Sequence, residues 1–186
     1  MPPCRAMFCR ARSFLSRRQT LRLRSQRRCC AGWKRPEGLA FVPVDFTRDS
    51  LAERLCSAGF DPAARAFFSW LGVTYYLPAE AVEETLAALS GLCAAGSALV
   101  FDYPDEGFFS AGERRVQNTI LMARAGGEPM RSAFSRPALE ALLQKHGFRI
   151  GALLTPEDIQ RDVIDRAGGA LKAFEHVNYC LAIREE

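Results

Sequence analysis

Polar or aromatic groups follow three apolar runs of this sequence, and their positions make them the best candidates for chemistry. The groups are Asp45-Phe46, Leu71-Gly72 with Tyr75 and Tyr76, and Asp102. In an open α/β sheet, ligands bind beyond the carboxyl ends of the parallel strands. A carboxylate beside an aromatic ring, as in Asp45-Phe46, could accept a hydrogen bond from an adenine amino group while the ring packs on the base.

Each of these groups also has a structural interpretation. An aspartate after a strand is more often a cap or turn former than a ligand. Tyr75 and Tyr76 could be half-buried packing residues as readily as substrate contacts. Asp102 lies near Asp105 and Glu106 and could form an acid–base pair with them, but we favour a solvated loop.

Other catalytic signatures are missing from the sequence. His146 and His176 have no serine or cysteine partner suggested by spacing, so we expect no catalytic triad and assign no catalytic residue. The seven cysteines form no C-x-x-C pair, which argues against a zinc site and against a disulfide framework. We therefore expect no metal and a reducing compartment. Neither G-x-G-x-x-G nor a P-loop is present.

The elements that must position these residues alternate between strand and helix from Leu39 onward, which predicts an α/β sheet. We expect strands at 39–45, 65–71, 98–103, 148–154 and 176–183, and helices at about 49–57, 78–96, 114–123, 135–146 and from 155. Asp49 is the expected N-cap of the first helix. The 65–71 run suits a parallel strand covered on both faces, and 176–183 alternates as an antiparallel edge strand would.

The first 38 residues differ from the rest in charge. They carry 11 Lys and Arg and one acidic residue, whereas residues 39–186 carry 14 basic and 20 acidic residues. We predict that residues 1–38 form a disordered basic leader, because high net charge with few large apolar residues cannot offset chain entropy. Three interpretations of this leader remain open. It could be an unstructured extension or a misread reading frame, a mitochondrial-type targeting segment, or a nucleic-acid-binding arm. We favour the first.

Several motifs of residues 39–186 together resemble one family, the leucine carboxyl methyltransferase-like group of class I S-adenosylmethionine-dependent methyltransferases. They are Val42-Pro-Val-Asp-Phe, Leu51-Ala-Glu-Arg-Leu, Ala58-Gly-Phe-Asp-Pro, Phe68-Ser-Trp-Leu-Gly-Val-Thr-Tyr-Tyr-Leu-Pro, Leu99-Val-Phe-Asp-Tyr, Gly127-Glu-Pro-Met and the stretch from Leu139 to His146-Gly-Phe. The motifs occur in the family's order, which makes the resemblance more specific than any single one of them.

This resemblance implies a seven-stranded sheet in the order 3-2-1-4-5-7-6, of which the present strands correspond to the third through seventh. It implies S-adenosylmethionine as cofactor, with Asp45 and Phe46 as the adenine-contacting pair and Leu71 and Gly72 in a cofactor-contacting turn. The family usually has glutamate where this chain has Leu71. Tyr75, Tyr76 and Asp102 are the tentative substrate residues.

The family's first strand, its glycine-rich turn and its second strand should precede Val42, and the basic leader supplies none of them. We therefore expect an incomplete Rossmann-like sheet, mostly parallel with one antiparallel strand, and a truncated chain that could be inactive alone. The expected function is methyl transfer to an oxygen of a small-molecule or peptide carboxylate or hydroxyl. The alternative is a non-catalytic remnant or interaction module of the same fold.

Expectations for partners and location follow from the same features. No stretch reaches the roughly 18–20 apolar residues of a membrane span, and the acidic body argues against nucleic acid as a partner. An exposed strand edge would favour a homo-oligomer. We expect a cytoplasmic protein, with targeting by the basic leader as the alternative.

Overall fold

The computed structural model describes residues 7–11, 40–44 and 49–186. The chain divides into two compact units, residues 1–61 and 62–186. The predicted cofactor contacts Asp45 and Phe46 lie outside the described residues, as does most of the predicted leader.

The first unit contains two parallel strands and one helix. Strand β1 (Met7–Ala11) pairs with β2 (Ala40–Val44) in the register Met7 to Ala40. We predicted β2 but not β1, which lies inside the basic leader. β2 thus has a neighbouring strand from residues 1–38.

Helix α2 (Leu51–Ser57) follows in the same unit. Its N-cap is Ser50, whose side chain accepts a hydrogen bond from the Glu53 amide at 3.3 Å. The prediction of Asp49 as N-cap is wrong by one residue, and the Asp49 carboxylate instead pairs with Arg54 at 3.0 Å. A serine and an aspartate cap helices about equally well, so the sequence did not separate them.

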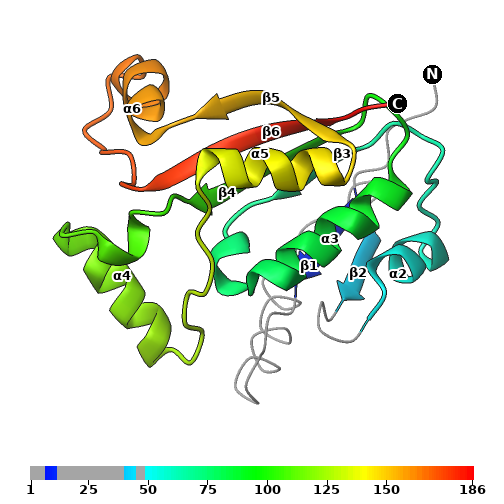
Figure 1. Ribbon diagram of the computed structural model, residues 1–186, viewed down its shortest axis with the longest axis horizontal. Helices are drawn as coiled ribbons and strands as arrows, with labels where there is room; N and C mark the ends of the chain where they lie inside the picture. The colour runs from blue at the N-terminus through cyan, green and yellow to red at the C-terminus, as the bar shows by residue number, and fades with distance from the viewer. Residues whose placement is uncertain (1–6, 12–39, 45–48) are drawn as a thin grey trace, which may run out of the picture. The chain divides into compact units, whose positions relative to one another are not determined.

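The second unit is built on a four-stranded sheet in the order β3-β4-β6-β5 (Figure 1). Its strands are β3 (Phe67–Trp70), β4 (Ala98–Pro104), β5 (Phe148–Leu154) and β6 (Val177–Arg184). β3 and β4 are parallel, and β6 is antiparallel to both β4 and β5. This order is the 4-5-7-6 portion of the predicted sheet. The β5–β6 register shifts at Gly151, which is an extra residue between the pairs Ile150–Ala182 and Ala152–Leu181.

Two expectations drawn from the hydrophobic pattern alone were wrong, although the implied strand order was right. The alternation of 176–183 indicated an edge strand, but β6 lies inside the sheet and alternates because one face is covered: Cys180 and Ala182 are buried, while Tyr179 on the other face is exposed. β3 lies at the edge of this sheet and is not covered on both faces, because the Phe67 side chain is 64% exposed.

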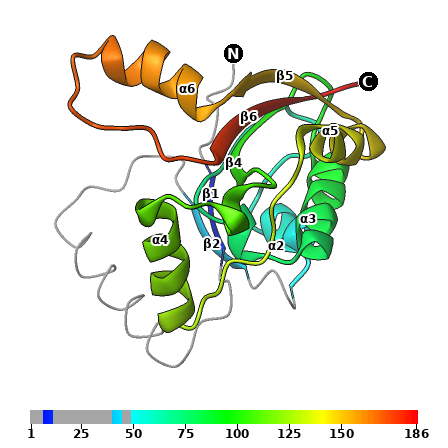
Figure 2. The same cartoon turned by 60° about the vertical axis from the view of Figure 1, so that its left-hand side comes forward.

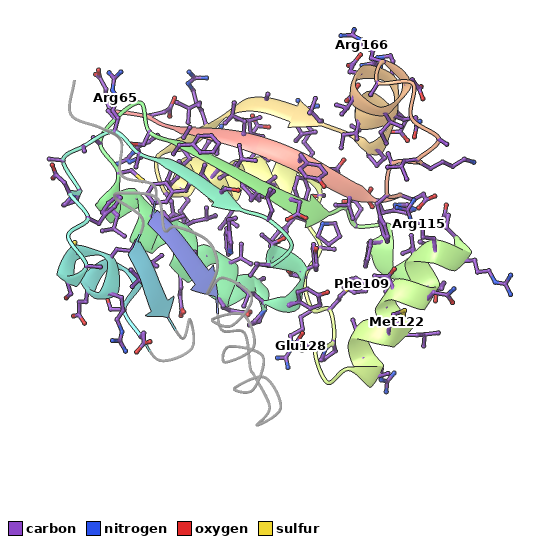
Figure 3. All side chains as sticks on the ribbon, turned by 180° about the vertical axis from the view of Figure 1, so that it is seen from behind. Arg65, Phe109, Arg115, Met122, Glu128 and Arg166 are labelled. Carbon is purple, nitrogen blue, oxygen red and sulfur yellow. The ribbon has the colours of Figure 1, made fainter. Side chains whose placement is uncertain are left out.

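Helices α3 (Ala79–Leu92) and α5 (Arg136–Lys145) lie on the same face of this sheet (Figures 1 and 3). The first was predicted from its apolar spacing, and the second from Ser135 and Pro137 at its start. The side chains that they bury are Val82, Thr85, Leu86, Leu89 and Leu92 from α3, and Leu139 and Leu143 from α5. Ser135 caps α5 and Pro137 lies in its first turn, as expected. These helices make the core that holds the strands in place.

The remaining elements lie near the carboxyl end of β4 and beyond β5 (Figure 2). Helix α4 (Arg114–Ala125) follows the short turn η2 (Phe108–Ser110), and its single buried residue, Val116, packs with Phe108 and Ala111. Helix α6 (Pro156–Ile159) begins with a capping box at Thr155 and continues into the π-helical turn η3 (Gln160–Asp165). Within the described ranges, no helix is long and apolar enough to cross a membrane.

Candidate functional site

The turn after β3 is locked to the neighbouring strand. Gly72 has φ +72°, a left-handed conformation that suits glycine, and its amide donates a hydrogen bond to Asp102 Oδ1 at 2.7 Å. Two residues later, at the start of the short helix η1 (Thr74–Tyr76), the buried Thr74 hydroxyl donates to the Asp102 carbonyl oxygen. One residue of β4 thus fixes the turn through both its side chain and its backbone.

Asp102 is not in a solvated loop. It lies within β4 and is 6% exposed, so neither the loop that we favoured nor an acid–base pair with Asp105 and Glu106 describes it. Burial raises the pKa of its carboxyl group above the ordinary value, because desolvation disfavours the charge. Hydrogen bonds from the Gly72 amide and the Tyr75 hydroxyl act in the opposite direction.

Three tyrosines surround this carboxylate. The Tyr75 and Tyr76 rings meet edge to face with centroids 4.8 Å apart. Tyr179 lies directly opposite Asp102 in the β4–β6 register. Burial raises the pKa of all three phenols, and the negative charge of Asp102 adds to the rise.

Tyr179 was not among the predicted site residues. The strand that carries it was predicted, but its antiparallel pairing with β4 sets which side chain faces Asp102, and the sequence does not contain that register.

A second segment holds the turn from the other side. The Ser132 hydroxyl donates to the Thr74 carbonyl oxygen at 2.9 Å, and the Arg131 amide donates to the Tyr75 carbonyl oxygen at 2.6 Å. Ser132 is buried. The backbone of η1 is therefore tied to β4 and to the chain between α4 and α5, which fixes where Tyr75 and Tyr76 lie.

Of the predicted cofactor residues, the structure describes Leu71 and Gly72. The Leu71 side chain is 47% exposed at the end of β3, and the turn after it is the one that Asp102 fixes. The structure thus brings Gly72, Tyr75 and Asp102 together, with Tyr76 against Tyr75 and Leu71 at the margin.

Metal and disulfide chemistry find no support in the described part of the chain. It contains no cluster of three His, Cys, Asp or Glu side chains able to hold a metal ion. Cys56, Cys93 and Cys180 are free thiols.

The two histidines occupy different environments. His146 ends α5, where its Nε2 atom lies 3.4 Å from the Glu83 carboxylate. His176 immediately precedes β6, and its Nδ1 atom lies 2.9 Å from Asp105 Oδ1. This second pair was not predicted, because its members are separated by 71 positions and meet only when β6 pairs with β4.

A model of the leucine carboxyl methyltransferase family matches residues 16–90. The Bacillus subtilis (strain 168) protein named "Putative S-adenosyl-L-methionine-dependent methyltransferase YktD" is 38% identical over 152 residues, which are 81% of this chain and 50% of YktD. The resemblance to the leucine carboxyl methyltransferase family is confirmed. The family match includes Leu71, Gly72 and the two neighbouring tyrosines, and it begins inside the predicted leader. The chain spans half the length of YktD.

Solved structures agree on the fold. A DUF574 family protein from Streptomyces avermitilis MA-4680 superposes with a TM-score of 0.59 and 14% identity, covering 78% of this chain and 55% of that one. Human N-acetylserotonin methyltransferase, solved in complex with S-adenosylmethionine, superposes with a TM-score of 0.50 and 14% identity, covering 84% of this chain and 36% of that one. The predicted α/β class, a Rossmann-like class I methyltransferase sheet, is thereby confirmed for the second unit.

Proposed function

We propose that this protein takes part in S-adenosylmethionine-dependent methyl transfer to an oxygen atom of a small-molecule or peptide acceptor. Asp45, Phe46, Leu71 and Gly72 are the proposed cofactor residues. Tyr75, Tyr76 and Asp102 are the proposed acceptor residues. The name of YktD supports the cofactor and the class of reaction.

The observation that carries this proposal is the Gly72–Asp102 contact. It rigidly connects the turn after β3 to β4 at the carboxyl edge of the sheet, where α/β folds bind ligands. A fixed turn there can hold a cofactor and an acceptor at a constant separation. Methyl transfer is a displacement that depends chiefly on such positioning.

The described residues are compatible with the cofactor, although they offer it few polar contacts. Leu71 presents an exposed apolar side chain beside the turn, but the Gly72 amide is already bonded to Asp102. S-adenosylmethionine, when bound, would supply an electrophilic methyl group. Leu71 would contribute packing where the family's usual glutamate would contribute a hydrogen-bond acceptor.

Isothermal titration with S-adenosylmethionine tests this proposal. The wild-type chain is expected to bind, and Leu71→Glu is expected to bind more tightly, because it restores a hydrogen-bond acceptor at an exposed position. Leu121→Glu is the matched control, since Leu121 is also exposed but lies on α4. Absence of binding by both the wild type and Leu71→Glu would contradict the proposal and favour a non-catalytic module of the same fold.

We further propose self-association through the β3 edge and a cytoplasmic location, with targeting by residues 1–38 as the alternative location. The exposed Phe67 on the edge strand supports the first. The free thiols of the described cysteines support a reducing compartment.

A further inference from the structure

We propose that His176 is the general base of the reaction, oriented by Asp105, and that the methyl acceptor is a neutral hydroxyl group rather than a carboxylate. This inference rests on the proposed function and narrows it to one class of acceptor. It is carried by the geometry around the imidazole ring at the start of β6.

The ring is held in a fixed orientation. His176 has φ +61°, and its carbonyl oxygen accepts a hydrogen bond from the Asp105 amide at 2.9 Å. Its Nδ1 atom lies 2.9 Å from Asp105 Oδ1, and that oxygen also accepts from the Gly107 amide at 2.8 Å. A Cβ atom at Gly107 would lie 3.0 Å from the ring, so the glycine allows the imidazole to lie close against this turn.

This arrangement leaves Nε2 as the reactive nitrogen. A carboxylate at Nδ1 favours the tautomer with the proton on Nδ1 and a lone pair on Nε2. Nε2 lies 3.6 Å from Glu113 Oε2, longer than a hydrogen bond, and the His176 side chain is 28% exposed. Nε2 can therefore accept a proton from a ligand, and Glu113 would then stabilise the imidazolium.

The His176–Asp105 pair lies at the same edge of the sheet as the Gly72 turn. Asp105 follows the last residue of β4 and is three positions beyond Asp102, a separation of roughly 10 Å along an extended chain. A ligand that extends from the turn toward α4 would reach Nε2. A non-Gly residue with positive φ is often retained at a functional site because neighbouring contacts hold it in place.

The charges around the pair disfavour an anionic acceptor. Asp105 and Glu113 flank the ring, and Glu175 precedes it in the chain. Arg115 on α4 (Figure 3) already has partners of its own. Its guanidinium donates to the Lys172 and Ala173 carbonyl oxygens and lies 3.9 Å from Glu175. It also stacks over the Phe174 ring, 4.5 Å from the ring centroid. A carboxylate acceptor would add negative charge beside these groups, whereas a hydroxyl would not.

The proposed step balances in protons and electrons. As the hydroxyl oxygen forms a bond to the methyl carbon of the sulfonium donor, the carbon–sulfur bond breaks and its electron pair remains on sulfur. The hydroxyl proton moves to Nε2 of His176, and the imidazolium later releases it to water. The products are a methyl ether, S-adenosylhomocysteine and one proton.

The first test is independent of activity. The chain has two histidines, so nitrogen NMR of the labelled protein can be assigned with a His146→Asn variant. We expect His176 in the Nδ1–H tautomer in the wild type, and an altered tautomer ratio in Asp105→Asn. An Nε2–H tautomer in the wild type would overturn the assignment of His176 as a base.

The second test uses labelled S-adenosylmethionine with catechol, benzyl alcohol and benzoate as probes. His176→Asn is the informative variant, because asparagine tolerates the left-handed backbone at this position. It should lower kcat about 100-fold or more and remove the fall in rate at low pH, with cofactor binding unchanged. Asp105→Asn should lower kcat in the same direction, and His146→Asn should leave it unchanged.

The outcomes separate the two proposals. Absence of cofactor binding by the wild type would contradict the proposed function itself. The tautomer measured by NMR would still test the His176–Asp105 geometry in that case. If the cofactor binds, three results would overturn the general-base proposal. They are methylation of benzoate, no methylation of either hydroxyl probe, and an unchanged pH profile in His176→Asn.

Discussion

At the scale of single residues, Asp102 does two things that oppose each other. It accepts hydrogen bonds from the Gly72 amide and the Thr74 hydroxyl of the β3–η1 turn, which stabilises the fold, but it is itself desolvated, which costs free energy when the carboxyl group is charged. The Tyr75 hydroxyl and the Gly72 amide reduce that cost by donating to it.

The pH dependence of the free energy of unfolding should show the effect of burying the Asp102 carboxyl group. Because burial raises the pKa of Asp102 in the folded protein, its contribution to the free energy of unfolding is fully present below the unfolded pKa and is lost as the pH rises through the folded pKa. We expect Asp102→Asn to lack this loss, and Asp102→Ala to be destabilised by about 1–3 kcal/mol because the Gly72 amide loses its partner. Urea unfolding between pH 4 and 8 measures both.

Tyr75→Phe provides the control for this prediction. It removes a hydrogen bond that lowers the pKa of Asp102, so the decline in stability should move to higher pH. An identical pH profile for the wild type and Asp102→Asn would show that the carboxyl group does not titrate in this range.

The sequence predicted several candidate site residues, but not all of the contacts between them. Asp102, Tyr75 and Gly72 were found because each follows an apolar run, and adjacent parallel strands end at one edge. Tyr179 and the His176–Asp105 pair were missed because they depend on the antiparallel register of β6. A period-2 pattern gives the face of a strand but not its partner.

At the scale of elements, helices were predicted better than strand positions. The apolar spacing of α3 and the serine and proline at the start of α5 are local signals, and each helix was predicted to within a few residues. Whether a strand is covered on its faces depends on elements that are distant in sequence. This is why the covering of β3 and the edge-like alternation of β6 were misinterpreted, although the resemblance implied the correct strand order.

Two glycines distinguish a position that requires glycine from one that tolerates it. Gly91 lies in α3 with open space around its Cα, so Gly91→Ala should raise the free energy of unfolding by up to about 1 kcal/mol. Gly72→Ala should lower it by about 1–2 kcal/mol, because its φ of +72° strains any L side chain although a Cβ would meet the Tyr75 hydroxyl at an ordinary 3.6 Å. Chemical denaturation of both variants gives the comparison, and equal effects would contradict it.

At the scale of the whole molecule, the sheet of the second unit has two edges of different character. The β3 edge exposes Phe67, whereas the β5 edge contains the register shift at Gly151. Exposed edge strands with apolar side chains favour pairing between chains. Self-association should therefore depend on β3.

We expect Phe67→Lys to weaken concentration-dependent association in sedimentation velocity, because a lysine on an edge strand opposes pairing with another strand. Leu171→Lys is the control, since Leu171 is similarly exposed but lies outside the sheet. Association that both variants leave unchanged would exclude the β3 edge as the contact.

The extra residue at Gly151 has a consequence for how far such pairing could go. A bulge bends its strand and interrupts the row of hydrogen-bonding groups that an incoming strand would need, and a side chain at Gly151 would collide with Ile183, whose Cγ1 atom lies 2.9 Å from the position of a Cβ. A four-stranded sheet with one receptive edge and one obstructed edge can join a single neighbouring sheet, and the paired sheets then have no free receptive edge. For the sheet of the second unit, pairing through β3 would close as a dimer instead of growing into an open fibre.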